Sequence, residues 1–81
     1  MSENHFLQYY KSDALLVVNT FGHIRVLYTP FRVLCNATIG NLSSGTWVYV
    51  DEVCSNTRDE LIYLIYGQPY SYKHFRLQIS F

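Results

Sequence analysis

Short stretches typical of β-strands fill most of this chain. Some of them alternate between apolar and polar residues, and others are continuous apolar runs. The runs 14–20 and 23–29 are rich in β-branched and aromatic residues. They flank Phe21-Gly22, where the glycine can supply the positive φ of a tight reversal. Ile24, Val26 and Tyr28 alternate with the residues between them, as in a strand with one buried face. The pattern predicts an amino-terminal hairpin over residues 14–29.

The residues before this hairpin are mixed in character. We expect Phe6, Tyr9 and Tyr10 to fold back onto the core from a short strand or a single helical turn. After Pro30, which interrupts the pattern because it cannot donate a ladder hydrogen bond, five further short strands are predicted. They cover residues 31–36, 46–53, 60–66, 70–73 and 75–81.

Two of these strands, and the polar stretches beside them, carry specific expectations. Phe31, Val33 and Cys35 fall on one face of the strand 31–36, and the run 46–53 is the clearest candidate for a central strand. The polar residues 36–45 predict a long loop, which Ile39 and Leu42 anchor to the core. A polar turn is expected from Asp51-Glu52 and residues 55–59.

The segment 58–66 is compatible with two structures. Thr57 followed by Glu60 fits a helix capping box, and Gly67 with Pro69 would end a helix. This gives an α+β alternative with a short helix at 58–66. However, the run Leu61–Tyr66 has no polar face and is rich in β-branched and aromatic residues. We favour a buried strand, followed by a tight reversal at Gly67-Gln68-Pro69.

In number and spacing, the five strands from Phe31 onward resemble the small barrel of the Src-homology-three (SH3-like) class. We therefore expect an all-β fold, a small SH3-like barrel of about five short strands with an additional amino-terminal hairpin, in a single domain over residues 1–81. The chain has no Ala-Leu-Tyr-Asp-Tyr type motif. The resemblance therefore does not imply recognition of proline-rich peptides.

Composition narrows the range of partners. Of the 81 residues, 49% are hydrophobic and 17% aromatic, enough for one rich core in a chain of this size. Six acidic residues balance six basic ones, so the net charge is zero. Such a chain is not steered globally toward nucleic acid or an anionic membrane, and little charge repulsion opposes self-association. On this basis we expect a homo-oligomer.

The candidate chemical sites are weak. Cys35 and Cys54 are expected as free, buried thiols rather than as a disulfide, because the expected compartment is reducing. Neither is expected to be a catalytic nucleophile, because nothing in the sequence brings a histidine beside either. No two Cys or His residues have the spacing of paired zinc ligands, and neither couple of adjacent carboxylates forms a natural acid/base pair. We expect no catalytic site, metal or cofactor. With no secretory signal and no apolar run long enough to cross a bilayer, we expect a cytoplasmic protein without membrane contact.

The remaining signal is an excess of aromatic residues. Five of them exceed what a core this small absorbs easily: Trp47, Tyr49, Tyr66, Tyr70 and Tyr72. We interpret them as a tyrosine-rich face that binds a peptide or the edge strand of a protein partner, including a second copy of the chain. The predicted function is a non-enzymatic protein-interaction module.

An alternative is single-stranded nucleic-acid binding. Tyr70 and Tyr72 interleave with Lys73 and Arg76, and such segments stack bases while their cations meet phosphates. Arg25 and Arg32 would supply further phosphate contacts. The zero net charge makes this alternative the weaker one.

Overall fold

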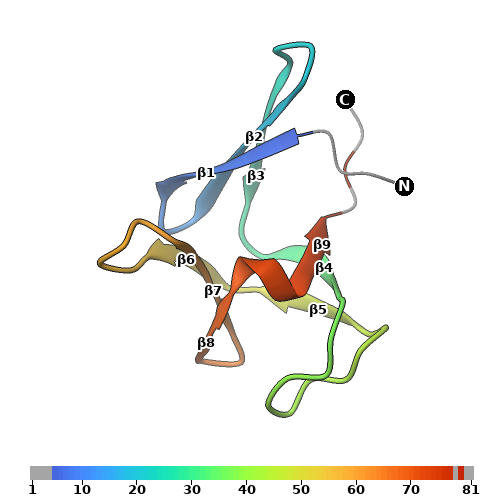
Figure 1. The fold of residues 1–81 in the computed structure, drawn as a ribbon. Helices are drawn as coiled ribbons and strands as arrows, with labels where there is room; N and C mark the ends of the chain where they lie inside the picture. The colour runs from blue at the N-terminus through green and yellow to red at the C-terminus, as the bar shows by residue number, and fades with distance from the viewer. Residues whose placement is uncertain (1–4, 78, 80–81) are drawn as a thin grey trace.

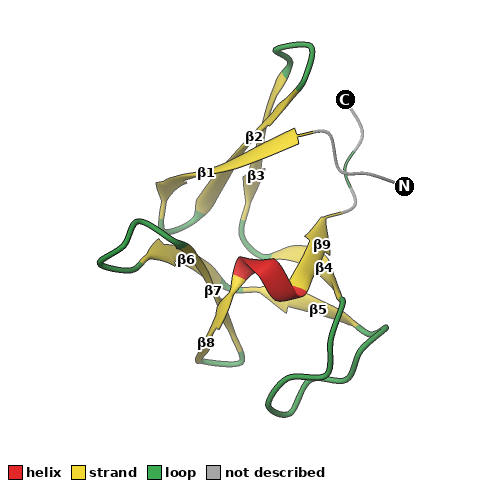
Figure 2. Ribbon diagram, in the orientation of Figure 1, coloured by secondary structure: helices red, strands yellow, loops and turns green. Residues whose placement is uncertain are grey.

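The computed structural model describes residues 5–77 and 79, and these residues form antiparallel strands and one 3-10 turn, without an α-helix (Figure 2). The elements, in chain order, are β1 (His5–Lys11), β2 (Ala14–Asn19), β3 (Ile24–Tyr28), β4 (Phe31–Cys35), β5 (Trp47–Val50), β6 (Glu52–Ser55), β7 (Leu61–Ile65), β8 (Gln68–Ser71), the 3-10 turn η1 (Tyr72–His74) and β9 (Phe75–Leu77). The all-β prediction is confirmed.

Within the described residues, the strands form three antiparallel sheets, ordered β1-β2-β3, β5-β4-β9 and β6-β7-β8. The predicted hairpin over 14–29 is confirmed as β2 and β3, and it extends away from the other two sheets (Figure 1). Its loop is held by Asn19, whose Oδ1 accepts hydrogen bonds from the N–H groups of Phe21 and His23, each at 2.9 Å. Gly22, at φ 83°, completes the reversal.

The amino-terminal residues form strand β1, which was one of the two predicted possibilities. The prediction that their aromatic side chains fold back onto the core is wrong, because Phe6, Tyr9 and Tyr10 are 70%, 42% and 57% exposed. Leu7 packs against the core instead. Phe6 points to the opposite side of the sheet from Leu7, and Tyr10 lies at an irregularity where the pairing with β2 shifts register.

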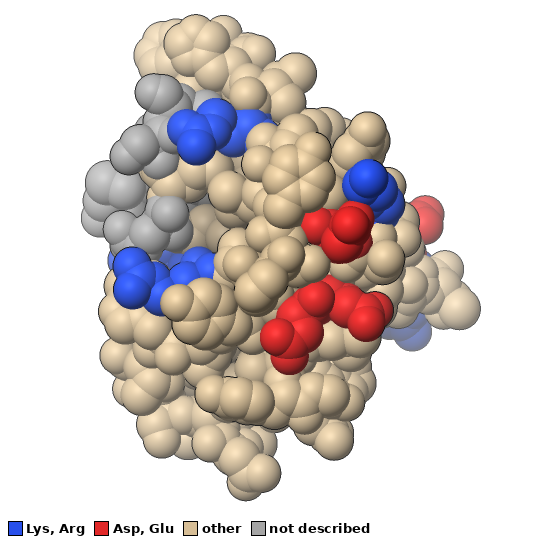
Figure 3. All heavy atoms as spheres, turned by 180° about the vertical axis from the view of Figure 1, so that it is seen from behind, with Lys and Arg blue, Asp and Glu red and all other residues tan. Residues whose placement is uncertain are grey.

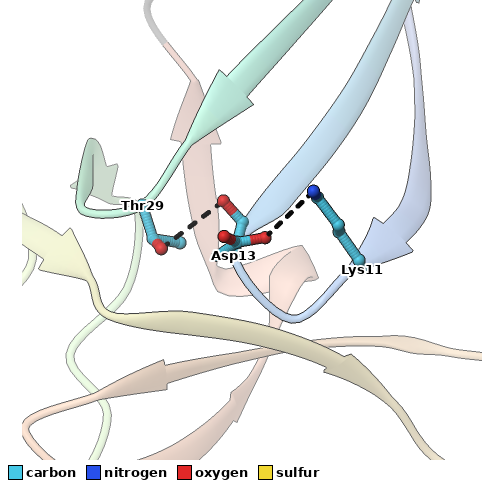
Figure 4. A network of polar contacts seen from close by, with 3 residues as sticks. All are labelled: Lys11, Asp13 and Thr29. Carbon is cyan, nitrogen blue, oxygen red and sulfur yellow. Dashed lines mark hydrogen bonds and ion pairs between the residues drawn. The ribbon is translucent and has the colours of Figure 1, made fainter.

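The amino-terminal sheet is tied to the rest of the molecule at the β1-β2 turn. The Thr29 N–H donates to the carbonyl oxygen of Asp13 at 2.9 Å, and the Val53 N–H donates to that of Ser12 at 2.8 Å. The Thr29 hydroxyl also reaches the Asp13 carbonyl, and Lys11 pairs with the Asp13 carboxylate at 3.9 Å (Figure 4). Because both partners of that ion pair are more than half exposed, it contributes at most about 1 kcal/mol. The backbone bonds therefore fix this junction.

One continuous core joins the three sheets. It comprises Leu15, Val17, Phe31, Val33, Cys35, Leu42, Val48, Val50, Val53, Leu61, Tyr63, Ile65, Phe75 and Leu77. The predicted inward face of residues 31–35 is thus confirmed. Tyr63 is the largest fully buried side chain, and its ring centroid lies 5.8 Å from those of both Phe31 and Phe75.

The loop over residues 36–45 and its two anchors are also confirmed. Leu42 is buried, and Ile39 packs against the core while half-buried. The two residues form an isolated β-bridge, with each N–H donating to the other's carbonyl oxygen at 2.9 Å. The loop is therefore closed on itself.

The single central strand predicted over 46–53 is two strands, and each of them lies at the edge of its sheet. β5 pairs with β4, whereas β6 pairs with β7 in another sheet. The change occurs at Asp51, whose N–H donates to the Leu64 carbonyl at 2.8 Å. Strands that bend at such corners are the usual way for a chain to pass from one sheet to another. The polar turn expected at Asp51-Glu52 is therefore only this bend, and Glu52 belongs to β6.

The helix alternative at 58–66 is wrong. Residues 61–65 form β7, with Leu61, Tyr63 and Ile65 buried and the residues between them half-buried. The capping signal is overridden by Asn56, whose Oδ1 accepts hydrogen bonds from the N–H groups of Arg58 at 2.9 Å and of Glu60 at 3.0 Å. An Asx turn of this kind offers the backbone a local alternative to a helix.

The reversal after β7 begins one residue earlier than predicted and is one residue shorter. Ile65 pairs directly with Gln68, so the loop consists of Tyr66 and Gly67, at φ 53° and 75°. Two positive φ values are what a type I′ turn requires, and this turn matches the twist of the hairpin. Pro69 therefore lies inside β8, which is an edge strand of its sheet.

The predicted strands 70–73 and 75–81 need correction in their bounds. β8 ends at Ser71, and residues 72–74 form η1 because the Ser71 hydroxyl accepts a hydrogen bond from the Lys73 N–H. β9 covers Phe75–Leu77, and Ile79 packs against the core. Residues 78, 80 and 81 lie outside the described residues.

Tyr66 holds a conformation that costs a non-glycine residue about 1–2 kcal/mol, although asparagine adopts it more readily. We expect Tyr66→Asn to raise the free energy of unfolding by about 0.5–1 kcal/mol, measured by chemical denaturation. The same substitution at Tyr49, in the middle of β5, should lower stability, because asparagine is disfavoured in strands. An unchanged or lower stability for Tyr66→Asn would contradict the turn assignment.

Burial raises the pKa of the Tyr63 phenol far above its ordinary value of 10.0, and Tyr72 adds to the shift. Above about pH 10 only the unfolded chain ionises at this position, so the free energy of unfolding falls by up to about 1.4 kcal/mol per pH unit. We expect Tyr63→Phe to remove that part of the alkaline sensitivity. Urea unfolding of both proteins, below and above the ordinary tyrosine pKa, measures it. Equal alkaline losses would contradict the assignment to Tyr63.

Candidate interaction surfaces

The predicted aromatic residues lie in several places. Trp47 and Tyr49 project from the solvent side of β5, where they are 42% and 57% exposed, while Val48 and Val50, which alternate with them, point into the core. Arg32 of β4 lies across from Tyr49 and holds its guanidinium 4.5 Å from the Trp47 ring centroid. These residues form a small aromatic and basic patch on one sheet.

Tyr70 and Tyr72 are half-buried and pack against the core. The Tyr70 ring meets Phe75 edge-on at 6.0 Å, and its hydroxyl lies beside Gly40. A Cβ at Gly40, which also has φ 55°, would stand only 3.1 Å from that oxygen. Tyr70 therefore serves the packing of the 36–45 loop. Tyr66, 76% exposed, stands at the β7-β8 turn.

Of the five aromatic residues, Tyr70 and Tyr72 are therefore half-buried, and the other three are exposed. Lys73 and Arg76 are exposed, and both line a hollow of about 450 Å³ beside β1, together with Tyr72. Arg76 also lies across from Leu34 on the outer side of β9 and β4. Nucleic-acid binding through Tyr70, Tyr72, Lys73 and Arg76 stays a prediction.

A larger apolar surface, which the sequence reasoning missed, lies on the outer face of the sheet β1-β2-β3. Direct cross-strand pairing places Phe6, Val18 and Ile24 in one row, and Gln8, Leu16 and Val26 in the next. By strand alternation Tyr28 lies on the same side. We call these seven residues the outer face. Phe6, Ile24 and Tyr28 are 70%, 59% and 62% exposed.

A signal for this face was present in the sequence. Ala14 to Val18 is an unbroken apolar run. A strand with one solvent-exposed face alternates between apolar and polar residues, whereas an unbroken apolar run is typical of a strand that is covered on both faces. In β2, Leu15 and Val17 point into the core, which leaves Leu16 and Val18 for the opposite side.

Charged groups and thiols offer little chemistry in the described part of the chain. Viewed from behind, acidic and basic side chains form small separate groups on a mostly uncharged surface (Figure 3). No three His, Cys, Asp or Glu side chains among the described residues lie together as metal ligands would. Both cysteines are free: Cys35 is buried, donating its thiol to the Ala37 carbonyl at 3.0 Å, whereas Cys54 is only half-buried, contrary to prediction.

Within residues 5–77 and 79, no helix has the length and apolar character needed to cross a membrane. Comparison with protein-family models, with curated proteins and with solved structures gave no match to this chain.

Proposed function

We propose that this protein is a non-enzymatic protein-interaction module that associates with a second copy of itself through the outer face. The observation that carries the proposal is the apolar character of that face across all three strands of its sheet. Gln8 is the only polar side chain in its two central rows.

The size of the face supports this function. With roughly 200 Å² per large side chain, Phe6, Ile24 and Tyr28 together expose on the order of 400 Å². Exposed apolar patches of roughly 300–600 Å² are the largest that monomers usually carry, and they are often functional. Two such patches placed together, with the half-buried residues between them, approach the roughly 1,000 Å² of the smaller specific interfaces.

The charge distribution favours a second copy as the occupant. The two central rows of the outer face have no charged member, so a two-fold contact there brings no like charges together. Lys11 stands at the margin, in the row of Tyr28, where it pairs with Asp13. The chain as a whole has zero net charge, and so long-range repulsion does not oppose pairing. A strongly acidic or basic partner would find no complement on this face.

For the body of the domain, we propose the SH3-like barrel suggested by the strand pattern. Two features support it. The first and last strands after Pro30, β4 and β9, pair with each other, and the bend at Asp51 passes the chain from the β4 sheet to the β7 sheet. Both features bring two small sheets toward closure around one core. In this arrangement β1-β2-β3 is the additional element that carries the interface.

Sedimentation velocity over a dilution series tests the proposed function. The weight-average sedimentation coefficient should rise with protein concentration from the monomer value toward that of a dimer. It should do so equally at low and high salt, because the contact is apolar. A coefficient that stays at the monomer value at the highest concentration reached would remove the proposal.

A further inference from the structure

A groove runs beside β1 on the side away from β2. Two adjoining hollows, of about 450 and 500 Å³, share Leu7, Tyr72 and Lys73, so they form one continuous depression. The first lies between β1 and β9, and the second continues toward the β6-β7 turn. We call this depression the β1 groove. It adjoins the outer face along β1, where Phe6 and Gln8 border both surfaces.

Two strands along this groove are edges of their sheets. Among the described strands, β1 pairs only with β2, and β9 pairs only with β4. An edge strand presents a row of backbone N–H and C=O groups without ladder partners, and these groups are a template for a further strand. The backbone of β1 can therefore hold an extended peptide by main-chain hydrogen bonds.

The bottom of the groove suits alternate side chains of such a peptide. Phe75 and Leu77 are buried beneath it, and Leu7 packs against the same core. Phe6 stands exposed at its rim. In an extended peptide every second side chain points the same way, so one set would contact this apolar bottom while the other set faces solvent.

Charge gives the groove a direction. Lys73 and Arg76 line the first hollow, where none of the described lining residues is acidic. Asp59 and Glu60 line the second hollow together with Lys73, which lies where the two hollows meet, whereas Arg76 lines only the first hollow. β1 runs from the basic end toward the acidic end. A peptide antiparallel to β1 therefore places its carboxyl end near the two cations and its amino end near the two carboxylates, which is the favourable pairing at both ends.

We propose that the β1 groove binds an extended peptide antiparallel to β1, with an acidic or free carboxyl end held at Lys73 and Arg76. The lining part of β1, Phe6 to Tyr9, spans roughly 14 Å, so about four to six peptide residues are engaged. Antiparallel pairing is also the commoner and slightly more stable arrangement of neighbouring strands.

Affinity selection from a synthetic library of linear octapeptides with free termini tests this site. The Ile24→Lys variant is used beside the wild-type protein, so that self-association and peptide binding are read separately. We expect the retained peptides to alternate apolar residues, with acidic residues toward the carboxyl end and basic residues toward the amino end. In amide NMR spectra, a retained peptide should shift the signals of Phe6–Tyr9 and of Phe75–Leu77.

Two matched changes give the decisive comparison. Lys73→Glu should weaken a retained peptide about tenfold or more, whereas Lys11→Glu, an equal charge reversal outside the groove, should not. Every second amide of an extended peptide points toward β1. N-methylation of that set of amides should abolish binding, because their hydrogen bonds to β1 are lost, whereas N-methylation of the other set should not. Retention of no peptide, shifts confined to other surfaces, or binding indifferent to both Lys73→Glu and N-methylation would overturn the proposal.

Discussion

Replacing Tyr63 with alanine is expected to lower the free energy of unfolding by about 3–5 kcal/mol and leave most of the chain unfolded at room temperature. Tyr63 is 1% exposed, and its ring stands between Phe31 of the β4 sheet and Phe75 of β9. Removing it opens a cavity where strands from two sheets meet. Urea denaturation followed by circular dichroism measures the change.

Tyr49→Ala provides the matched control. The same atoms are removed from the outer side of β5, where Tyr49 is 57% exposed, so a loss of about 1 kcal/mol or less is expected. If the two variants unfolded at the same urea concentration, Tyr63 would not be the centre of the core.

The second large effect concerns the interface. Ile24→Lys should raise the dissociation constant of the dimer at least about a hundredfold, because each copy would bury an ammonium group against an apolar surface. Ile24 is 59% exposed at the edge strand β3, so the monomer should keep its stability. Sedimentation equilibrium of the variant and of the wild-type protein gives both dissociation constants.

Tyr49→Lys is the matched control for this change. It adds the same charge at a side chain of nearly equal exposure, but on the aromatic and basic patch of β5. Trp47 and Tyr49 of this patch belong to the tyrosine-rich face that the sequence predicts. The outer-face proposal requires dimerisation to survive in Tyr49→Lys. Loss of dimerisation in this variant, with none in Ile24→Lys, would assign self-association to β5 and reject the outer face.

Much of the strand pattern could be predicted because local rules and tertiary packing agree there. The alternation of Phe31, Val33 and Cys35 matched the buried face of β4, and Gly22 marked the reversal of the first hairpin. In residues 61–65, the absence of a polar face correctly outweighed a capping signal. An apolar segment can follow a helix-capping motif and still form a strand, because packing within a sheet favours its β-branched and aromatic residues.

The other parts of the fold depended on tertiary contacts that the sequence does not reveal. The passage between sheets at Asp51 is set by a backbone bond to Leu64, and no residue type marks it. Tyr66 occupies a turn position that glycine or asparagine usually takes, so the reversal was placed later.

The prediction of one tyrosine-rich face could not include contacts of this kind either. Counting aromatic residues pointed to Tyr70 and Tyr72, yet packing on Phe75 and the loop at Gly40 half-buries Tyr70. Exposure is decided by neighbours from distant parts of the chain. The unbroken run Ala14 to Val18 carried more information, because it requires apolar side chains on both faces of β2.

The most direct test of self-association through the outer face is solvent paramagnetic relaxation of side-chain protons, recorded on dilute and concentrated protein with a neutral gadolinium chelate. The account predicts that the methyl groups of Ile24 and Val26 lose their relaxation enhancement on concentration, while the indole of Trp47 keeps its own. Methyl groups that stay equally accessible at both concentrations, in a sample that sedimentation shows to be dimeric, would contradict it.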